Sequence, residues 1–389
     1  MRILDTRLNG KQVKSFYSGM PKSLVCFSHL RWDFVFQRPQ HLLTRLAKTF
    51  NIFFIEEPIY DAKGKSYYGF LNRGENIVII QPHLKAGISA DKNKAVQKGL
   101  FDNFMNNRKL SDYLFWYYTP MALEFSRKYD PQITVFDCMD ELSAFKFAPE
   151  ELKVLEKELM AKADIVFTGG HSIYEAKKNL HANIYPFPSS IEKEHFAKAR
   201  LINKNHNGTV KLGFFGVIDE RFDIELIREM ADKKPDWQII LIGPVVKIDP
   251  ATLPKNNNII YLGPKRYDEL PEHLAAWDIA LIPFLLNDST RFISPTKTPE
   301  YLAAAKPVIS TPIRDVVDPY GKNKLVNIGR NAQDFIAAAE KELRVKQKDE
   351  WLKRVDSFLA LNSWDKTCIH MLGLINKTIN SETYTSIAQ

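Results

Sequence analysis

Cysteine is scarce in this 389-residue sequence, and its three cysteines stand far apart. Cys26, Cys138 and Cys368 form no Cys-x-x-Cys pair and show no spacing typical of a metal site. This scarcity excludes a fold built on a disulfide framework and fits a reducing compartment such as the cytosol.

Long apolar runs are missing as well. No segment approaches the roughly 20 apolar residues that a membrane-spanning helix needs. The first 20 residues contain no apolar core, so we expect no signal peptide. We therefore expect a cytoplasmic protein.

The net charge is moderately positive, at +8, and basic residues are dense at 63–109 and at 341–353. A solvated surface is the simpler explanation for each cluster. Peripheral contact with the anionic inner face of the cell membrane, or with an anionic acceptor, is the sharper explanation. We expect no nucleic-acid partner, because no binding motif accompanies the charge.

Motifs for metals and for common phosphate loops are also absent. The chain contains no Asp-x-Asp, and its nine histidines form no HExxH or similar cluster. Neither GxGxxG nor a Walker loop occurs. We therefore expect no catalytic metal and no bound cofactor.

Short β-branched or aromatic runs alternate with helical stretches along most of the chain, which predicts an α/β fold with doubly wound parallel sheets. In the first half we expect strands at 23–27, 51–55, 76–80, 113–117, 133–136, 164–168 and 183–185. We expect helices there at 37–49, 120–128, 149–163 and 172–180.

A polar stretch at 203–209 interrupts this alternation and reads as a linker. After it we expect strands at 210–215, 238–242, 258–262, 279–283, 308–310 and 324–327. The expected helices are 223–233, 268–276, 299–305 and 332–344, and the tail at 349–377 is helical by its period. The predicted domains are 1–203 and 204–362, followed by a C-terminal helical segment at 363–389.

One segment of the second domain suggests an anion site. Ser294, Thr296 and Lys297 precede an expected helix that Thr298 can cap. Free backbone N–H groups, the helix dipole and an ammonium would all favour a negative ligand there. Glu300, inside the first turn, can bind the hydroxyls of a ribose. We interpret this segment as a site for a nucleotide diphosphate.

The loop after the first strand of the second domain contains Gly216 and Arg221. Glycine lets the backbone turn tightly near a ligand, and arginine can bind a phosphate through two donors. Alone, the loop could equally be the start of a helix. Together with Lys297, Arg221 would match the charge of a leaving diphosphate without a metal.

Three segments of the first domain carry polar groups to the expected cleft. Asp140 and Glu141 follow a strand, and either can act as a general base, or a residue of this segment can simply cap the next helix. The loop after the first strand and a later strand end supply candidate acceptor or sugar contacts: His29, Trp32, Gln37, Arg38 and His171. The aromatic residues could instead be core, and a lone histidine is more often structural.

From about Lys22 onward the chain resembles GT-B glycosyltransferases of the GT4-like kind, especially bacterial members of cell-surface polysaccharide or teichuronic acid synthesis. Four segments carry the resemblance: Trp32 with QRPQH at 37–41, FDCMDE at 136–141, GVIDERFD at 216–223, and SPTKTPEYLA at 294–303 with KPV at 306–308. Such a fold has two Rossmann-like domains facing a central cleft and a last helix, beginning near Trp364, that crosses back to the first domain.

The resemblance implies roles for individual residues. Glu300 would bind the donor ribose, Lys297 and Arg221 the diphosphate, and Asp140 would be a base or an acceptor-side carboxylate. It also implies retention of the anomeric configuration. The chain departs from the family pattern at three positions, where Phe292, Val217 and Ala305 replace the usual glutamate, arginine and glycine.

These observations predict a glycosyltransferase that moves a sugar from a UDP- or GDP-type donor to a glycan or lipid-linked acceptor. The first domain would bind the acceptor and the second the donor. Two alternatives remain open: a nucleotide-sugar epimerase of the same fold, and a non-catalytic nucleotide-binding scaffold.

Overall fold

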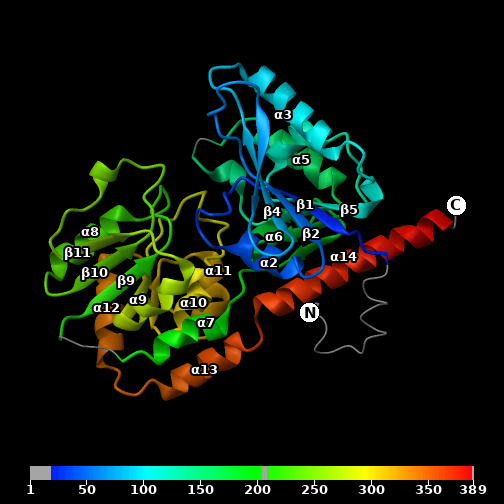
Figure 1. Ribbon diagram of the computed structural model, residues 1–389. Helices are drawn as coiled ribbons and strands as arrows, with labels where there is room; N and C mark the ends of the chain where they lie inside the picture. The colour runs from blue at the N-terminus through cyan, green and yellow to red at the C-terminus, as the bar shows by residue number, and fades with distance from the viewer. Residues whose placement is uncertain (1–18, 147, 204–207, 388–389) are drawn as a thin grey trace.

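The computed structural model describes residues 19–146, 148–203 and 208–387. Two domains, each built around a sheet, lie next to one another (Figure 1). Most of the predicted linker at 203–209 lies outside the described residues, because 204–207 are not among them.

The first domain is built on an eight-stranded sheet that is parallel except for one edge strand, β3, which runs antiparallel to β4. Apolar residues fill most of its central strands, as expected where helices cover both faces. In sheet order the strands are β3 (Tyr67–Asn72), β4 (Ile77–His83), β2 (Asn51–Ile55), β1 (Ser23–Phe27), β5 (Tyr113–Tyr117), β6 (Ile133–Cys138), β7 (Ile165–Thr168) and β8 (Ile184–Pro186).

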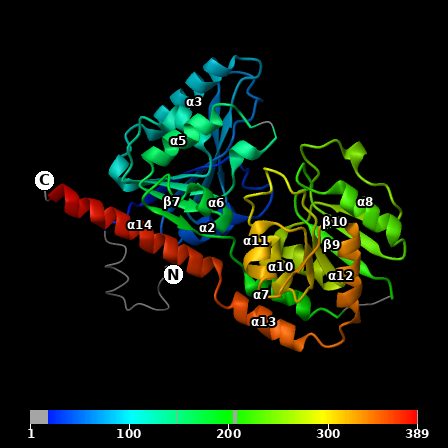
Figure 2. The same ribbon diagram turned by 180° about the vertical axis from the view of Figure 1, so that it is seen from behind.

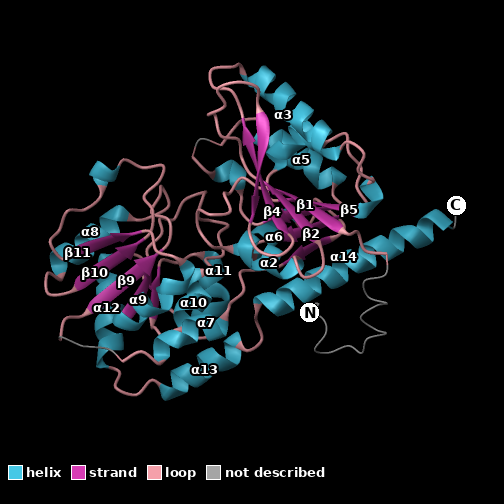
Figure 3. Ribbon diagram, viewed as in Figure 1, coloured by secondary structure: helices cyan, strands magenta, loops and turns pink. Residues whose placement is uncertain are grey.

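Helices cover the two faces of this sheet, and strand side chains alternate between them. Leu24 and Cys26 of β1 belong to the core on one face, whereas Val25 and Phe27 belong to the core on the other. Figure 3 shows the helices on either side of the strands. They are α2 (Arg38–Leu46), α3 (Ala90–Met105), α4 (Leu123–Ser126), α5 (Leu152–Lys162) and α6 (His171–Lys177).

The second domain has a six-stranded, entirely parallel sheet with one continuous core. Its strands, in sheet order, are β11 (Ile259–Gly263), β10 (Gln238–Ile242), β9 (Lys211–Phe215), β12 (Ile279–Ile282), β13 (Val308–Ser310) and β14 (Asn327–Ile328). Its helices are α7 (Lys193–Ala197), α8 (Ile224–Lys233), α9 (Leu270–Ala276), α10 (Lys297–Ala303), α11 (Arg314–Val316), α12 (Ala332–Arg344) and α13 (Asp349–Leu359).

The chain crosses between the domains twice. Ile191 and Phe196 already belong to the core of the second domain, so the first crossing comes before the predicted boundary at residue 203. Near the end, α14 (Trp364–Ile387) returns, and Trp364, Met371 and Ile375 pack into the core of the first domain. Figure 2 shows α14 running from α13 along the first domain, which confirms the predicted crossing helix.

The predicted fold class is confirmed, and most predicted elements lie within a few residues of the observed ones. Several elements were missed, among them the exposed edge strand β3, the long helix α3 and the short helices α7 and α11. The predicted strand at 324–327 lies three residues too early, because β14 begins at Asn327. Within the described ranges, no helix is both long enough and apolar enough to span a membrane.

Candidate active site

A cavity of about 160 Å³ lies between the two domains, and it collects nine of the predicted site residues. The loop before α2 and the segment after β6 form the wall from the first domain. The turn after β9 and the start of α10 form the opposite wall. The predicted residues in its lining are Gln37, Arg38, Asp140, Gly216, Arg221, Ser294, Thr296, Lys297 and Glu300.

Lys297 begins α10 and reaches the cavity through space that a glycine leaves open. Gly216 has φ +138°, and a Cβ at this position would lie 2.0 Å from Cε of Lys297. The Lys297 ammonium lies 5.7 Å from the ring centre of Phe214 and 5.8 Å from that of Phe284. Burial lowers the pKa of Lys297, and the nearby Glu300 carboxylate opposes that shift. An anion in the cavity would therefore meet a poorly hydrated cation.

Arg221 is held in place by Asp219, two residues before it. The Asp219 carboxylate accepts hydrogen bonds from Nε of Arg221 at 3.0 Å and from Nη2 at 2.6 Å. It also accepts from the Arg221 backbone N–H at 3.0 Å. The guanidinium lies 5.1 Å from the ring centre of Phe145, across the domain boundary. Asp219 was not among the predicted site residues, although its spacing from Arg221 is visible in the sequence.

Glu300 lies one turn into α10, is only 6% exposed and lines the cavity. Burial raises the pKa of Glu300 to about 7, while Lys297 acts in the opposite direction. The capping role predicted for Thr298 is wrong. The helix begins at Lys297, two residues before the predicted start, so Thr298 lies inside it. The buried Thr298 hydroxyl has no hydrogen-bond partner among the described residues.

Asp140 faces these groups from the first domain. Burial raises the pKa of Asp140 to about 6, and the positive charges of Arg221 and Arg38 limit the rise. Glu141, predicted as a second catalytic candidate, lies outside the cavity. It pairs with Lys177 at 2.7 Å and accepts a hydrogen bond from Ser143, so the structure assigns it a structural role.

Arg38 lines the cavity, but its guanidinium donates most of its hydrogen bonds to groups inside the first domain. Its Nε and Nη2 bind the fully buried Asp137 at 3.0 and 2.8 Å, and its Nη1 donates to the carbonyl of Phe187 at 2.7 Å. We interpret this pair as a structural link between α2 and β6 rather than a sugar contact. Gln37 precedes α2, and its backbone N–H donates to the Gln40 side chain at 3.0 Å.

A second cavity, of about 320 Å³, adjoins the first and shares Gln37, Asp140 and Arg221 with it. His29 lines this second cavity. Burial lowers the pKa of His29 to about 4, and its Nδ1 has no hydrogen-bond partner in the described part of the chain. A neutral imidazole with a free nitrogen can bind a hydroxyl group.

Trp32 and His171 are not in either cavity. Trp32 packs against Phe54, with ring centres 5.2 Å apart, so the structure supports a core role for Trp32 and not a contact with the acceptor or sugar. Its backbone N–H donates to Glu56 at 2.7 Å. His171 begins α6 and is exposed, outside the residues that line the two cavities.

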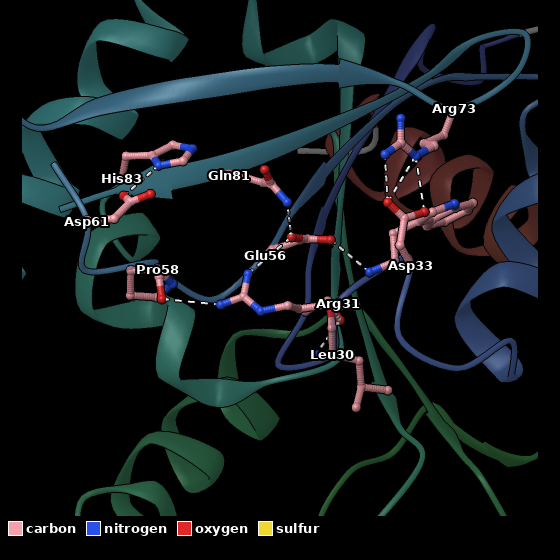
Figure 4. Close-up of polar contacts among 11 residues, drawn as sticks. Leu30, Arg31, Asp33, Glu56, Pro58, Asp61, Arg73, Gln81 and His83 are labelled. Carbon is pink, nitrogen blue, oxygen red and sulfur yellow. Dashed lines mark hydrogen bonds and ion pairs between the residues drawn. The ribbon is translucent and has the colours of Figure 1, made fainter. Parts of the chain in front are cut away.

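A buried carboxylate holds the loop that carries His29 and Gln37. Figure 4 shows Glu56 between Arg31 and Gln81, which donate to it at 3.3 and 3.0 Å. The same figure shows Arg73 of the edge hairpin bound to Asp33 of the loop, at 2.7 Å. These contacts fix the loop to β2 and β4 on one side of the second cavity.

Two aromatic residues of the cavity wall were not predicted. Phe36 and Tyr267 stack across the domain boundary with ring centres 4.5 Å apart. The Tyr267 hydroxyl donates to Glu192 at 2.9 Å. No local pattern connects residues so far apart in the sequence, so only the fold could bring them together.

A comparison with known protein families identifies the part of the chain that contains most of this site. Residues 211–344 match the family described as glycosyl transferases group 1. This part is a group 1 glycosyltransferase domain. The match spans β9 to α12 and includes Gly216, Arg221, Lys297 and Glu300.

One curated relative is the glycosyltransferase TuaH of Bacillus subtilis (strain 168), named for teichuronic acid biosynthesis. It is 29% identical to this chain over 252 residues, and the alignment covers 59% of this chain and 63% of that relative. The alignment thus covers less than two thirds of either protein. This match, at 29% identity over part of each protein, confirms the resemblance to bacterial surface-polysaccharide glycosyltransferases.

Solved glycosyltransferase structures share the whole fold at low sequence identity. Sucrose-phosphate synthase from Thermosynechococcus elongatus has a TM-score of 0.67 and 14% identity, over 92% of this chain and all of that chain. WaaG, a glycosyltransferase of lipopolysaccharide biosynthesis, has a TM-score of 0.60 and 12% identity, over 90% of this chain and 99% of that chain. These likenesses confirm the GT-B fold of the chain.

Phe292 stands where the family usually has a glutamate, and it is not in the lining of the first cavity. It packs against the core of the first domain, and the Arg291 guanidinium lies 5.3 Å from its ring centre. Among the described residues, no three His, Cys, Asp or Glu side chains gather as metal ligands would. The absence of a catalytic metal stays a prediction.

Proposed function

We propose that this chain is a glycosyltransferase that transfers a sugar from a UDP- or GDP-type nucleotide sugar to a hydroxyl group of a glycan or lipid-linked acceptor. The second domain binds the donor and the first binds the acceptor. The process is bacterial surface-polysaccharide synthesis, carried out in the cytoplasm or at the inner face of the cell membrane. The relative named for teichuronic acid biosynthesis supports this assignment.

One observation carries the proposal: Lys297, Arg221 and Glu300 of the second domain share a cavity with Asp140 of the first. The two cations match a diphosphate, and Glu300 is placed one helical turn away for the ribose hydroxyls. One solved neighbour, the trehalose-6-phosphate enzyme from E. coli, is described with bound UDP-2-fluoro glucose, at a TM-score of 0.64 and 14% identity.

In the proposed reaction the acceptor oxygen forms a bond to the anomeric carbon while the bond from that carbon to the diphosphate oxygen breaks. The diphosphate leaves with both bonding electrons, and Lys297 and Arg221 stabilise its charge. Asp140 takes the proton of the acceptor hydroxyl. The reaction proceeds without a metal. Retention of the anomeric configuration, which rests on family resemblance alone, requires the acceptor oxygen to bond on the face from which the diphosphate leaves.

Phe292 favours one alternative, a member that binds nucleotide but transfers nothing, because it removes a carboxylate that the family usually has next to the donor. The epimerase alternative has no observation of its own in its favour. Transfer and nucleotide binding must therefore be measured separately.

We expect Lys297→Ala and Glu300→Ala each to weaken UDP or GDP binding by about tenfold to a hundredfold, since each removes a charge-assisted contact. Thermal shift identifies the nucleotide that binds, and calorimetry then gives its Kd. Lys255→Ala and Glu272→Ala, exposed on the same domain, are the matched controls. Unchanged UDP and GDP affinity in both cavity variants would refute the site, and bound nucleotide without transfer to any acceptor would favour the scaffold.

A further inference from the structure

A third cavity, of about 420 Å³, lies entirely within the first domain and continues the second one. The two cavities share Glu57, Thr119, Met121 and Pro149 in their linings. The second cavity begins at Asp140, and the third extends to the first turns of α3. No predicted acceptor residue lines the third cavity.

We propose that these two cavities form one acceptor groove, which binds an oligosaccharide of two or more sugar units with its reacting end at Asp140. This inference rests on the proposed transferase function and chooses between its two acceptor classes. The occupant is a sugar chain, and a lipid-linked single sugar would leave the far half of the groove unused.

The chemistry of the far half supports a saccharide. Asn93 and Gln97 of α3 line it next to Phe125, and Oδ1 of Asn93 is buried with no hydrogen-bond partner in the described ranges. Sugar rings offer hydroxyl groups to amides and apolar C–H faces to aromatic rings. A lipid chain would leave the buried amide oxygen unpaired, which is unfavourable.

Two adjacent glutamates follow β2, and they differ in their hydrogen bonding. Both oxygens of Glu56 are engaged, one by the Trp32 N–H and the other by Arg31 and Gln81 (Figure 4). Glu57 is exposed where the two cavities meet, and no hydrogen-bond or ion-pair partner for its carboxylate occurs among the described residues. A carboxylate in this position can bind two neighbouring hydroxyl groups of the sugar unit next to the reacting one.

The charge of the far half argues against an anionic chain. Lys94 and Glu124 line the far half and form an ion pair at 2.5 Å, so their charges cancel. Taken together, the two linings contain five carboxylates and four cations: Glu56, Glu57, Glu124, Asp140 and Asp219 against Lys94, Lys146, Arg221 and Lys247. Because positive charge is not in excess, the groove fits a neutral oligosaccharide better than a polyanionic one.

The test compares acceptors that differ only in length: 4-nitrophenyl glycosides with one, two and three units of the same sugar. Ala90 lines the far cavity at the exposed start of α3, whereas Ala95 is exposed on the same helix outside the cavity lining. Ala90→Trp blocks the far half, and Ala95→Trp is its matched control. The full chain is used, with the nucleotide sugar that thermal shift identifies.

For the parent and Ala95→Trp, we expect kcat/KM to rise at least tenfold from one unit to three. In Ala90→Trp this rise should disappear while the rate with the one-unit glycoside stays the same. Asn93→Ala should lose about tenfold with the three-unit glycoside only. Ligand-observed NMR of the three-unit glycoside in the presence of UDP should show the same loss of binding in Ala90→Trp.

Equal kcat/KM at all three lengths would overturn the groove while leaving the transferase in place. So would faster transfer to a polyprenyl-linked single sugar that Ala90→Trp does not impair. If nucleotide binds but no acceptor of any length reacts or binds, the transferase itself fails and the groove fails with it.

Discussion

At the scale of the residue, the acid–base property of Asp140 depends on both domains. Burial in the closed cavity raises its pKa to about 6, while Arg38 of its own domain and Arg221 of the other hold the rise down. Asp219 and Asp137 push the pKa in the opposite direction, toward higher values. A general base works best when its pKa lies near the working pH, and this carboxyl comes close to that condition.

The proposed role of Asp140 requires its ionised form, so kcat should fall about tenfold per pH unit below a pH of about 6. The measurement uses saturating donor, because Glu300, with a pKa of about 7, would otherwise alter donor affinity over a nearby pH range. Asp140→Asn should lower kcat by at least a hundredfold, leave the nucleotide Kd within about threefold, and abolish this pH dependence. A parent-like kcat in the variant would remove Asp140 from the mechanism.

Single residues were predictable where the residue type and its position in the local sequence pattern indicated the same chemistry. Lys297, Arg221, Glu300 and Asp140 each stand at a strand end or helix start, and such positions converge in parallel sheets. Glu141 lies outside the cavity and pairs with Lys177, a neighbour in space that could not be read from the segment containing Glu141. The sequence places charges at the edge of a sheet, but only packing decides which carboxylate faces the ligand and which pairs with the scaffold.

At the scale of the element, the turn after β9 depends on two glycines, Gly216 in the turn itself and Gly243 in the segment packed against it. Gly216 has φ +138°, a region that side chains rarely adopt, and its missing Cβ leaves room for Lys297. A Cβ at Gly243, after the neighbouring strand β10, would lie 1.8 Å from the Gly216 carbonyl oxygen. The turn thus joins two strand ends and the start of α10 into one small unit.

Gly216→Ala should therefore reduce nucleotide affinity at least tenfold, because its Cβ displaces the Lys297 side chain as well as straining the backbone. Gly263→Ala is the matched control: it also has positive φ, at +65°, but its Cβ would meet nothing within 4 Å. The control should lose about 1 kcal/mol of stability from strain and keep its nucleotide Kd. If both variants lose affinity equally, strain in the loops and not the space for Lys297 is responsible.

Buried strands were easier to predict than exposed elements. Strands β1, β5 and β10 lie almost entirely in the core, and their apolar runs predicted the observed bounds, 23–27, 113–117 and 238–242. The missed strand β3 is a largely exposed edge strand. The missed helix α3 buries side chains only near its end, so its lysine-rich start carries a weak periodic signal.

At the scale of the whole molecule, a short set of buried hydrogen bonds holds the domains together beside the cavity. Asp315 of the second domain accepts from the backbone N–H of Ser172 at 3.1 Å and also from its hydroxyl. Ser189 donates to the carbonyl of Ser294 at 2.8 Å. At Gly170, an added Cβ would lie 2.3 Å from Oδ2 of Asp315, so the domains meet without room for a side chain. Segment-by-segment reading of a sequence cannot reveal such a contact.

This interface lets nucleotide binding and transfer be separated. In the proposed mechanism the diphosphate and ribose contacts lie on the second domain, and Asp140 of the first domain reaches the donor only when the domains are closed. Asp315→Ala leaves the buried Ser172 N–H without its partner, so closure should become less favourable by about 1–3 kcal/mol. We expect nucleotide affinity to fall less than threefold and kcat to fall about tenfold or more, because the closed state is populated less. Calorimetry gives the first quantity, transfer kinetics the second, and small-angle scattering should show a larger radius of gyration. The exposed Asp236→Ala on the same domain should change none of the three. If Asp315→Ala expands the molecule but transfers at the parent rate, closure at this interface does not limit turnover, and Asp140 must reach the donor in the open state.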